Sequence, residues 1–166
     1  MVRSPITEAS FRQACGQFAT GVAVATVCGP SGEPHGLTIN SFTSVSLTPP
    51  LILICIDYRA QVLQVFLRAS HFAVNILSDS QQDISNRFAT WPADRFVGLA
   101  WQPGLGGAPV FPGCCATLEV ANETMHVAGD HTIFIGRIER FGERVDLAPL
   151  LFHAGTYAGL APADED

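Results

Sequence analysis

Residues 36–51 read GLTINSFTSVSLTPPL, and the rest of the chain is organised around them. Seven of these sixteen residues are Thr, Ser or Asn, and they mostly alternate with apolar residues, as in a strand with one solvated face. That face carries hydroxyls and an amide but no charge. Neutral donors and acceptors on a rigid sheet suit a polar, uncharged or phosphate-bearing small molecule. A half-exposed strand rich in Ser and Thr, without any ligand, explains the same pattern.

Strands are predicted on both sides of this segment. Residues 22–28 form a nearly continuous apolar run, which indicates a strand buried on both faces, and residues 51–56 form another. The Gly- and Pro-rich residues 29–34 predict a turn, so that the strand beginning at His35 pairs with residues 22–28 as a hairpin. Further strands are predicted over residues 72–77, 116–123 and 132–141, and residues 150–157 are expected to close the fold.

Three short helices are predicted between the strands. The first covers residues 7–19, with Ser4 or Thr7 as its cap, Gly21 as its stop and an apolar stripe made of Phe11, Ala14, Cys15, Phe18 and Ala19. The others cover residues 61–68 and 80–89, and residues 91–111 are predicted to be mostly loop. Strands without a regular alternation of strand and long helix favour a mainly β fold, an antiparallel barrel with a few helices.

Length and composition limit the possible organisation and function. At 166 residues we expect one domain over residues 1–160, followed by a frayed acidic tail at 161–166. The net charge of −6 and the absence of lysine argue against a nucleic-acid-binding protein. Only 14% of the residues are charged, which favours oligomerisation. The lack of an ~18-residue apolar run and of a signal-peptide core predicts a cytoplasmic protein with no membrane span.

The five cysteines are interpreted as small apolar residues. An odd number in a chain of this kind argues against a disulfide framework, and no Cys-x-x-Cys spacing is present. Cys114 and Cys115 are adjacent, so in a strand they would face opposite sides and could not easily bind one metal ion. We therefore predict no metal site.

Glycine-rich and phosphate-binding motifs are weak or missing. Residues 104–107, Gly-Leu-Gly-Gly, follow no predicted strand and open no predicted helix, so they do not fit a dinucleotide-binding fingerprint. Residues 129–131, Gly-Asp-His, precede a predicted strand. There the glycine allows a close backbone turn, and the Asp could bias the tautomer of His131 or raise its pKa. A surface histidine with no role in catalysis explains the same triplet.

Several segments together resemble the short flavin reductases, the NAD(P)H-dependent partners of two-component flavin monooxygenases. The matching segments, in chain order, are 20–22 (TGV), 35–46 (HGLTINSFTSVS), 49–51 (PPL), Asn75, 85–89 (SNRFA), 129–131 (GDH) and 149–151 (PLL). The similarity extends from Phe11 to about Leu160. It implies an FMN-binding split β-barrel that is mainly β, antiparallel and Greek-key-like, with short helices.

The resemblance also implies which residues form the site. In that family the Gly-Asp-His segment lies by the nicotinamide, so His131 is expected to position the dinucleotide and to relay a proton. The flavin carries out the chemistry, and the protein supplies orientation and electrostatics. The residues expected to bind the flavin or the dinucleotide are Thr38, Ile39, Asn40, Ser41, Ser46, Cys55, Ile56, Asp57, Arg59, Asn86, Arg87, Phe88, Gly129, Asp130, His131 and Tyr157.

One departure from the family concerns residues 152–157. Many relatives have a basic residue in this stretch, where this chain has Ala154 and Thr156. This leaves open the choice between NADH and NADPH, just as the motifs leave open FMN or FAD.

The predicted function is an NAD(P)H:flavin oxidoreductase, a homodimer that supplies reduced flavin to a separate monooxygenase. One alternative is a protein of the same barrel that keeps its flavin tightly bound and reduces an organic substrate. Another is a non-catalytic flavin or haem binder. A purified protein that stays yellow through dialysis would favour the tightly bound flavin.

Overall fold

The computed structural model describes residues 5–90 and 94–161. Three sequence-based expectations lie partly or wholly outside these residues. They are Ser4 as a helix cap, the start of the predicted loop at residues 91–93, and the acidic tail from residue 162 onward.

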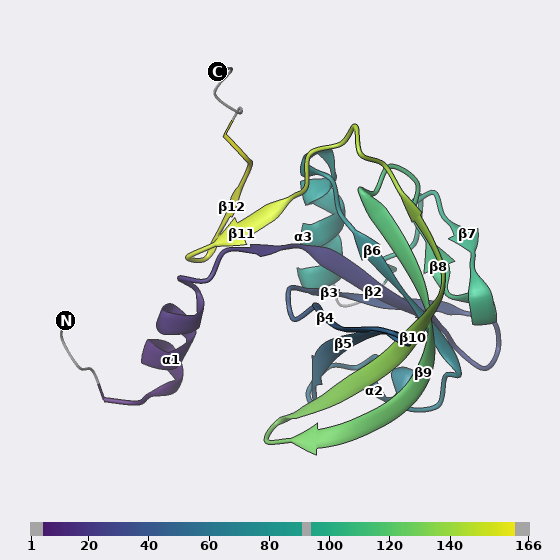
Figure 1. Cartoon of the computed structure of the whole chain (residues 1–166), viewed down its shortest axis with the longest axis horizontal. Coiled ribbons are helices and arrows are strands. Elements are labelled where there is room, and N and C mark those ends of the chain that lie inside the picture. Colours follow the sequence, from purple (N-terminus) through teal and green to yellow (C-terminus); the bar gives the residue numbers. More distant parts are fainter. Residues whose placement is uncertain (1–4, 91–93, 162–166) are drawn as a thin grey trace.

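The main sheet is antiparallel and contains seven of the described strands in the order β3-β2-β6-β9-β10-β5-β4. β9 and β10 are the longest and curve together along one side of the molecule (Figure 1). The strands are β2 (Ala23–Cys28), β3 (Pro34–Ile39), β4 (Thr43–Leu47), β5 (Pro50–Asp57), β6 (His71–Ile76), β9 (Ala116–Ala128) and β10 (His131–Glu143).

Two smaller sheets complete the strand structure. One joins β1, which precedes β2, to the hairpin near the C-terminus in the order β1-β11-β12, and the other pairs β7 with β8. Their bounds are β1 (Thr20–Gly21), β7 (Gln102–Pro103), β8 (Pro109–Val110), β11 (Leu151–His153) and β12 (Thr156–Ala158).

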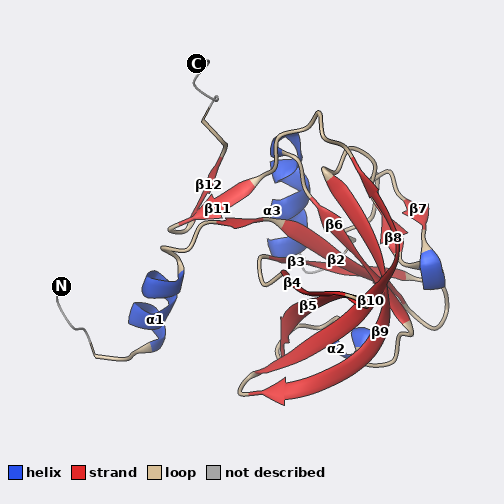
Figure 2. Cartoon of the chain, in the orientation of Figure 1, coloured by secondary structure: helices blue, strands red, loops and turns tan. Residues whose placement is uncertain are grey.

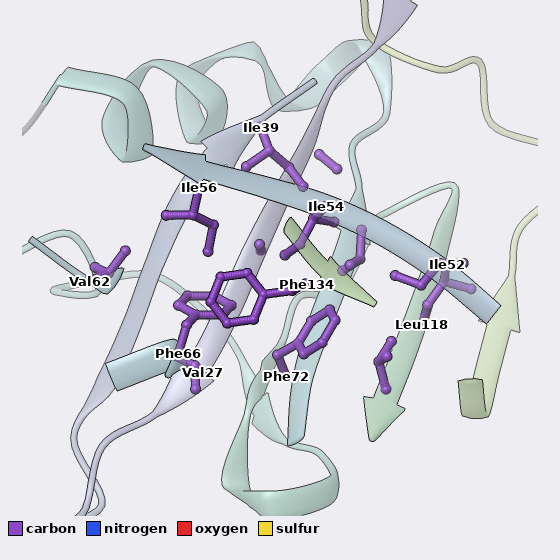
Figure 3. Close-up of a cluster of buried hydrophobic side chains, with 14 of the residues drawn as sticks. Val27, Ile39, Ile52, Ile54, Ile56, Val62, Phe66, Phe72, Leu118 and Phe134 are labelled. Carbon is purple, nitrogen blue, oxygen red and sulfur yellow. The ribbon is translucent and has the colours of Figure 1, made fainter. Parts of the chain in front are cut away.

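The main sheet curls into a barrel around one apolar core. β3 is at one end of the strand order and β5 is next to the other end, yet Ile39 and Ile54 are buried in the same cluster (Figure 3). Phe66, Phe72 and Phe134 fill its centre, with ring centroids about 6 Å apart. Because β3 does not pair with β4 or β5, the barrel has an open side there. The predicted fold class, mainly antiparallel β with short helices, is confirmed.

The helices are shorter than predicted: α1 (Glu8–Cys15), α2 (Leu63–Phe66) and α3 (Gln82–Thr90), with 3-10 turns η1 (Asp79–Gln81) and η2 (Leu105–Gly107) (Figure 2). Thr7 caps α1 as predicted, and its side chain and that of Ser10 form a capping box. α1 ends before Gly16 rather than at residue 19. No helix within the described residues has both the length and the apolar character needed to cross a bilayer.

The apolar stripe of α1 is not buried. None of the residues of α1 is buried, and the helix stands away from the barrel (Figure 1). Phe11 is 63% exposed, and Phe18, just beyond the helix, is 78% exposed. Periodicity shows that a helix has an apolar face but not what covers that face.

Residues 36–51 do not form one strand, contrary to the sequence-based interpretation. β3 ends at Ile39, residues 40–42 cross the open side of the barrel, and β4 begins at Thr43. The chain has to cross here because β3 and β4 lie at opposite ends of the strand order. Val45 and Leu47, which had seemed to alternate toward a core, are 46% and 91% exposed.

The two apolar runs differ in burial. β2 is buried along Ala23–Val27, as expected for a strand covered on both faces. In β5, by contrast, Ile52, Ile54 and Ile56 point into the core, and the residues between them are half-exposed. The outer face of β5 is therefore available to a ligand or to a partner.

Candidate functional site

Ser41 holds residues 40–42, which cross the open side of the barrel, against β5 through two hydrogen bonds. Its Oγ accepts from Cys55 N at 3.0 Å and donates to Cys55 O at 3.1 Å. β4 pairs with β5 only as far as the Thr43–Leu53 register, so the backbone of Cys55 lacks a strand partner on that side. The Ser41 hydroxyl supplies both missing hydrogen bonds. Ser41 therefore fixes where the neighbouring Asn40 lies.

A cavity of about 370 Å³ lies beside this crossing. Asn40, Ser41 and Thr43 line one side, and Thr20 and Gly21 of β1 line another. None of its lining residues is charged. Thr20 Oγ1 is enclosed and has no hydrogen-bond partner. Apolar walls with a few neutral hydrogen-bonding groups fit an uncharged aromatic ring system such as that of a flavin.

His131 and Asp57 face each other at the adjoining ends of β10 and β5. His131 Nδ1 lies 2.7 Å from Asp130 Oδ1, and Arg59 donates from Nη2 to Asp57 Oδ2 at 2.7 Å. Gly129, with φ of 61°, makes the turn that precedes His131. Because Asp130 lies in that turn and not in the strand, its side chain can reach the neighbouring His131.

The charges of this cluster determine which nitrogen of His131 is available. The hydrogen bond from His131 holds the pKa of Asp130 below its ordinary value. The guanidinium and the backbone N–H of Arg59 hold the pKa of Asp57 well below its ordinary value. An ionised Asp130 can only accept, so Nδ1 of His131 donates to it. A neutral His131 therefore carries its proton on Nδ1 and presents Nε2 as an acceptor.

Asp57, Asp130 and His131 also bring three possible metal-ligand atoms within 4.8 Å of one another. Arg59 already neutralises Asp57 there, with Nε at 3.1 Å from Oδ1 in addition to the Nη2 contact. A cation would compete with that guanidinium, and the spacing carries no assignment of a metal.

A third cluster joins α3 to β12. Thr38 Oγ1 donates to Ser85 O at 2.7 Å, and Tyr157 Oη donates to Asn86 Oδ1 at 3.0 Å. Ser85 Oγ lies 2.9 Å from Tyr157 Oη. Since the Tyr157 hydroxyl has one proton, which it gives to Asn86, Ser85 donates to Tyr157. The sequence-based set omitted Ser85, as it omitted Thr20 and Thr43 of the uncharged cavity, although all three stand in segments that match the family.

Three of the expected site residues have side chains that do not face the cavity or the clusters described above. Ile56 and Phe88 are 0% and 1% exposed, so they support the site from within the core. Arg87 donates from Nη1 to Val97 O at 3.1 Å and thereby holds the loop after α3. The alternation of β5 explains Ile56, and the apolar face of α3 explains Phe88.

The remaining residues lie around these clusters. Cys55 is half-buried on the outer face of β5, and burial raises the pKa of its thiol. Ile39 is 6% exposed and lines the uncharged cavity. Ser46 is half-exposed on β4. All five cysteines are free thiols; Cys114 is buried, as expected of a small apolar residue, whereas Cys15 is exposed.

Comparison with known proteins gives one family. The model described as "Flavin reductase like domain" matches residues 15–161. Among curated proteins, the chain is 43% identical to a "Probable flavin reductase" of Rhizobium meliloti (strain 1021), covering 89% of this chain and 47% of that protein. It is 36% identical to "Flavin-dependent monooxygenase, reductase subunit HsaB" of Mycobacterium tuberculosis, covering 92% and 82%.

Solved structures agree with these sequence matches. The "NADH:FAD oxidoreductase SgcE6" of Streptomyces globisporus C-1027, "in complex with NAD and FAD fragments", superposes with a TM-score of 0.93 at 37% identity and covers 99% of both chains. The chain spans about half the length of some curated relatives, 47% and 57% of the two from Rhizobium meliloti.

Proposed function

This chain belongs to the family of flavin reductase-like domains, and from that premise we propose that it is an NADH:flavin oxidoreductase. It would transfer a hydride from the dinucleotide to FMN or FAD and release reduced flavin. The observation that carries the proposal is the short separation of two sites along β5. The uncharged cavity is joined to Cys55 by Ser41, and Asp57, two residues or about 7 Å further along the strand, faces His131.

The residues of the chain have distinct roles in this reaction. Flavin, when bound, supplies the hydride acceptor. Asn40, Ser41 and Thr43 bind and orient its uncharged ring system. Nε2 of His131 accepts a hydrogen bond from the carboxamide of the nicotinamide and so positions the hydride donor. Asp130 holds His131 in the tautomer that leaves Nε2 free. We propose that Arg59, Asn86 and Tyr157 also contact the cofactor.

A coupled binding and turnover experiment tests this function. Purified protein should oxidise NADH in air at a rate that rises with added FMN or FAD, and it should lose its yellow colour on dialysis. NADPH, as the matched donor, should support a slower rate. A protein that stays yellow after dialysis and does not respond to added flavin would contradict a flavin that acts as substrate.

Changing the exposed Asn40, which lines the cavity, together with the half-exposed Ser46 of β4 tests the flavin site. The Asn40→Ala, Ser46→Ala double variant should bind flavin about tenfold more weakly, because each lost hydrogen bond contributes about 0.5–1.5 kcal/mol. Neither side chain hydrogen-bonds to another described residue, so the fold should keep its stability. Fluorescence titration measures the affinity, with Ser44→Ala on the same strand as control. Unchanged affinity in the double variant would remove these residues from the site.

We propose that the functional form of the protein is a homodimer. α1 has only eight residues, too short to be stable in water by itself, and its apolar stripe is not covered by the described part of its own chain. Val45 and Leu47 of β4 are exposed as well. A second copy would cover such surfaces permanently, which suits a chain with only 14% charged residues.

Sedimentation velocity tests the dimer. The wild-type protein should sediment at twice its 17.7 kDa mass at micromolar concentration. The Phe11→Asp, Phe18→Asp double variant should shift toward monomer, because it would place two carboxylates in an apolar contact. Val145→Asp, at a still more exposed position outside α1, should remain dimeric. A monomeric wild type would contradict the proposal.

The reduced flavin would serve a separate monooxygenase. The support is that the relative from Mycobacterium tuberculosis is named as the reductase subunit of such an enzyme. Adding this protein, NADH and flavin to a candidate monooxygenase should start oxidation of the monooxygenase's substrate. Oxidation at the same rate without this protein would argue against the pairing.

A further inference from the structure

A second cavity, of about 500 Å³, lies at the opposite end of β2 from the uncharged cavity. β2 begins at Ala23, which lines the uncharged cavity, and ends at Cys28, which lines the second one. The two residues are five positions apart, or about 17 Å along an extended strand. A flavin ring bound in the uncharged cavity would not reach the second one, and none of the roles described so far uses it.

The glycine-rich residues 104–107, which fit no dinucleotide-binding fingerprint, contribute one wall of this cavity. Gly106 lines it and has φ of 60°, and a Cβ at this position would lie 2.8 Å from Cβ of His71. Glycine therefore lets the loop lie directly against the start of β6. The carboxylate of Glu119 holds the loop there, because it accepts from Leu105 N at 2.6 Å. The wall is thus fixed by the fold.

Arg68 is the cation of this cavity, and its guanidinium is unpaired. It is exposed and forms no side-chain hydrogen bond or ion pair within residues 5–90 and 94–161. Every other arginine in these ranges donates to a carboxylate or to a carbonyl oxygen, as Arg12 does to Glu8. In a chain with a net charge of −6, an unpaired guanidinium beside a cavity is available to an anion from outside the chain.

The rest of the lining limits the kind of anion. Apolar surface and neutral polar groups come from Pro30, Val65, Ala69, Gln64 and Ser70. His71 Nε2 lies 3.2 Å from Glu139 Oε2, so one carboxylate of the protein is already close to the cavity. A single guanidinium near a fixed carboxylate favours a singly charged ligand over a doubly charged one such as phosphate. The planar fork of arginine matches the two oxygens of a carboxylate, and the apolar walls suit an organic body.

We propose that this cavity binds a small organic monocarboxylate. Arg68 pairs with the carboxylate, and the walls between α2 and the end of β2 hold the organic body. The proposal does not depend on the proposed function, because this ligand is neither the flavin nor the dinucleotide. It gives the protein a second binding site, remote from the site of hydride transfer.

Calorimetric titrations with matched acids and amides test this site. Benzoate, cyclohexanecarboxylate and hexanoate are the probes, and their amides are uncharged controls of the same shape. Saturating FMN is present to occupy the uncharged cavity. In the wild type, at least one acid should bind with a Kd below about 1 mM and about tenfold more tightly than its amide.

Two variants locate the binding, and a third is the control. Arg68→Gln should remove the preference for the acid over the amide. Gln64→Trp should fill the cavity and weaken binding of the acid about tenfold. Both positions are exposed, so neither change should disturb folding, and a melting curve checks this. Arg144→Gln, which removes an exposed arginine away from the cavity, should bind the acid as the wild type does.

The outcomes separate this proposal from the proposed function. The cavity is not a carboxylate site if no acid binds more tightly than its amide, or if either Arg68→Gln or Gln64→Trp keeps the wild-type affinity. Inorganic phosphate that binds as tightly as the acids would show a general anion site and would also overturn the proposal. Arg68→Gln should reduce flavin at the wild-type rate, since Arg68 lies in neither the flavin cavity nor the His131 cluster. A wild type that reduces no flavin would overturn the proposed function alone.

Discussion

Replacing His131 by alanine should slow NADH-dependent flavin reduction about 100-fold while leaving flavin affinity near the wild-type value. Hydride transfer requires the donor carbon within about 3–3.5 Å of the acceptor, and a misplacement of about 1 Å can cost on the order of 100-fold in rate. His131 is half-exposed at the end of β10, opposite Asp57, so it can reach a ligand on that surface. Stopped-flow reduction of flavin, with a melting curve for each protein, measures both effects.

Two further variants separate positioning from folding. Asp130→Asn keeps the size of the side chain but removes its negative charge, and an amide can donate as well as accept, so the proton of His131 is no longer fixed on Nδ1. The variant should lower the rate less than His131→Ala does. Its effect should be mainly on the KM for NADH, since the dinucleotide is then held less well. His126→Ala, on the exposed part of the same hairpin, should reduce flavin at the wild-type rate. A His131→Ala protein that melts early but reduces flavin normally would show that His131 serves the fold.

Replacing Asn75 by alanine should lower the free energy of unfolding by about 3 kcal/mol. Asn75 is fully buried, and its Nδ2 donates to Val24 O and Thr26 Oγ1 at 3.2 Å and to Pro109 O at 3.3 Å. Its Oδ1 accepts from Phe111 N at 2.9 Å. Alanine would remove all four hydrogen bonds and leave Phe111 N in the core without its acceptor, and such an unsatisfied buried group costs about 1–3 kcal/mol. Pro109 O keeps the hydrogen bond that Thr26 Oγ1 donates to it.

Urea unfolding measures this loss as a lower midpoint with an unchanged m-value. Gln102→Ala, at an exposed position on β7, should leave the midpoint unchanged. Flavin affinity per folded molecule should also stay unchanged in Asn75→Ala, because Asn75 lies inside the fold. A loss below about 1 kcal/mol would mean that water or a shifted loop satisfies Phe111 N in place of Asn75.

The role of Asn75 illustrates a site that the sequence could mark but not explain. It stands in a segment shared with the flavin reductases, which by itself could indicate a ligand contact. In the structure, Asn75 instead joins β2 and β6 to Pro109–Phe111 through hydrogen bonds. Phe111 in turn packs on Phe88 of α3, with 5.5 Å between the ring centroids. A polar residue shared with the family can therefore stabilise the fold that supports a site, without contacting the ligand itself.

The single-strand interpretation of residues 36–51 was wrong for a related reason. Alternation of polar and apolar residues is a property of neighbours along the chain, and it remains similar when a strand stops, crosses an open side and resumes as another strand. The break at Asn40 depends on the strand order, in which β3 and β4 are at opposite ends. The exposed stripe of α1 is a similar case, since the sequence defines the stripe but not its partner.

The sequence by itself determined the strands of the barrel apart from the division of residues 36–51 into β3 and β4. It also determined the capped start of α1, the uncharged character of residues 38–46 and the family, because these depend on residue type and on spacing along the chain. Only the tertiary structure decided that Ser41 supplies the missing partners of Cys55, that Asp57 faces His131, and that Ile56 and Phe88 point inward. Each of these facts depends on the register of strands that are distant in the sequence. Register is fixed by the packing of the whole core, since a slip of one residue would turn every side chain of a strand to the opposite face.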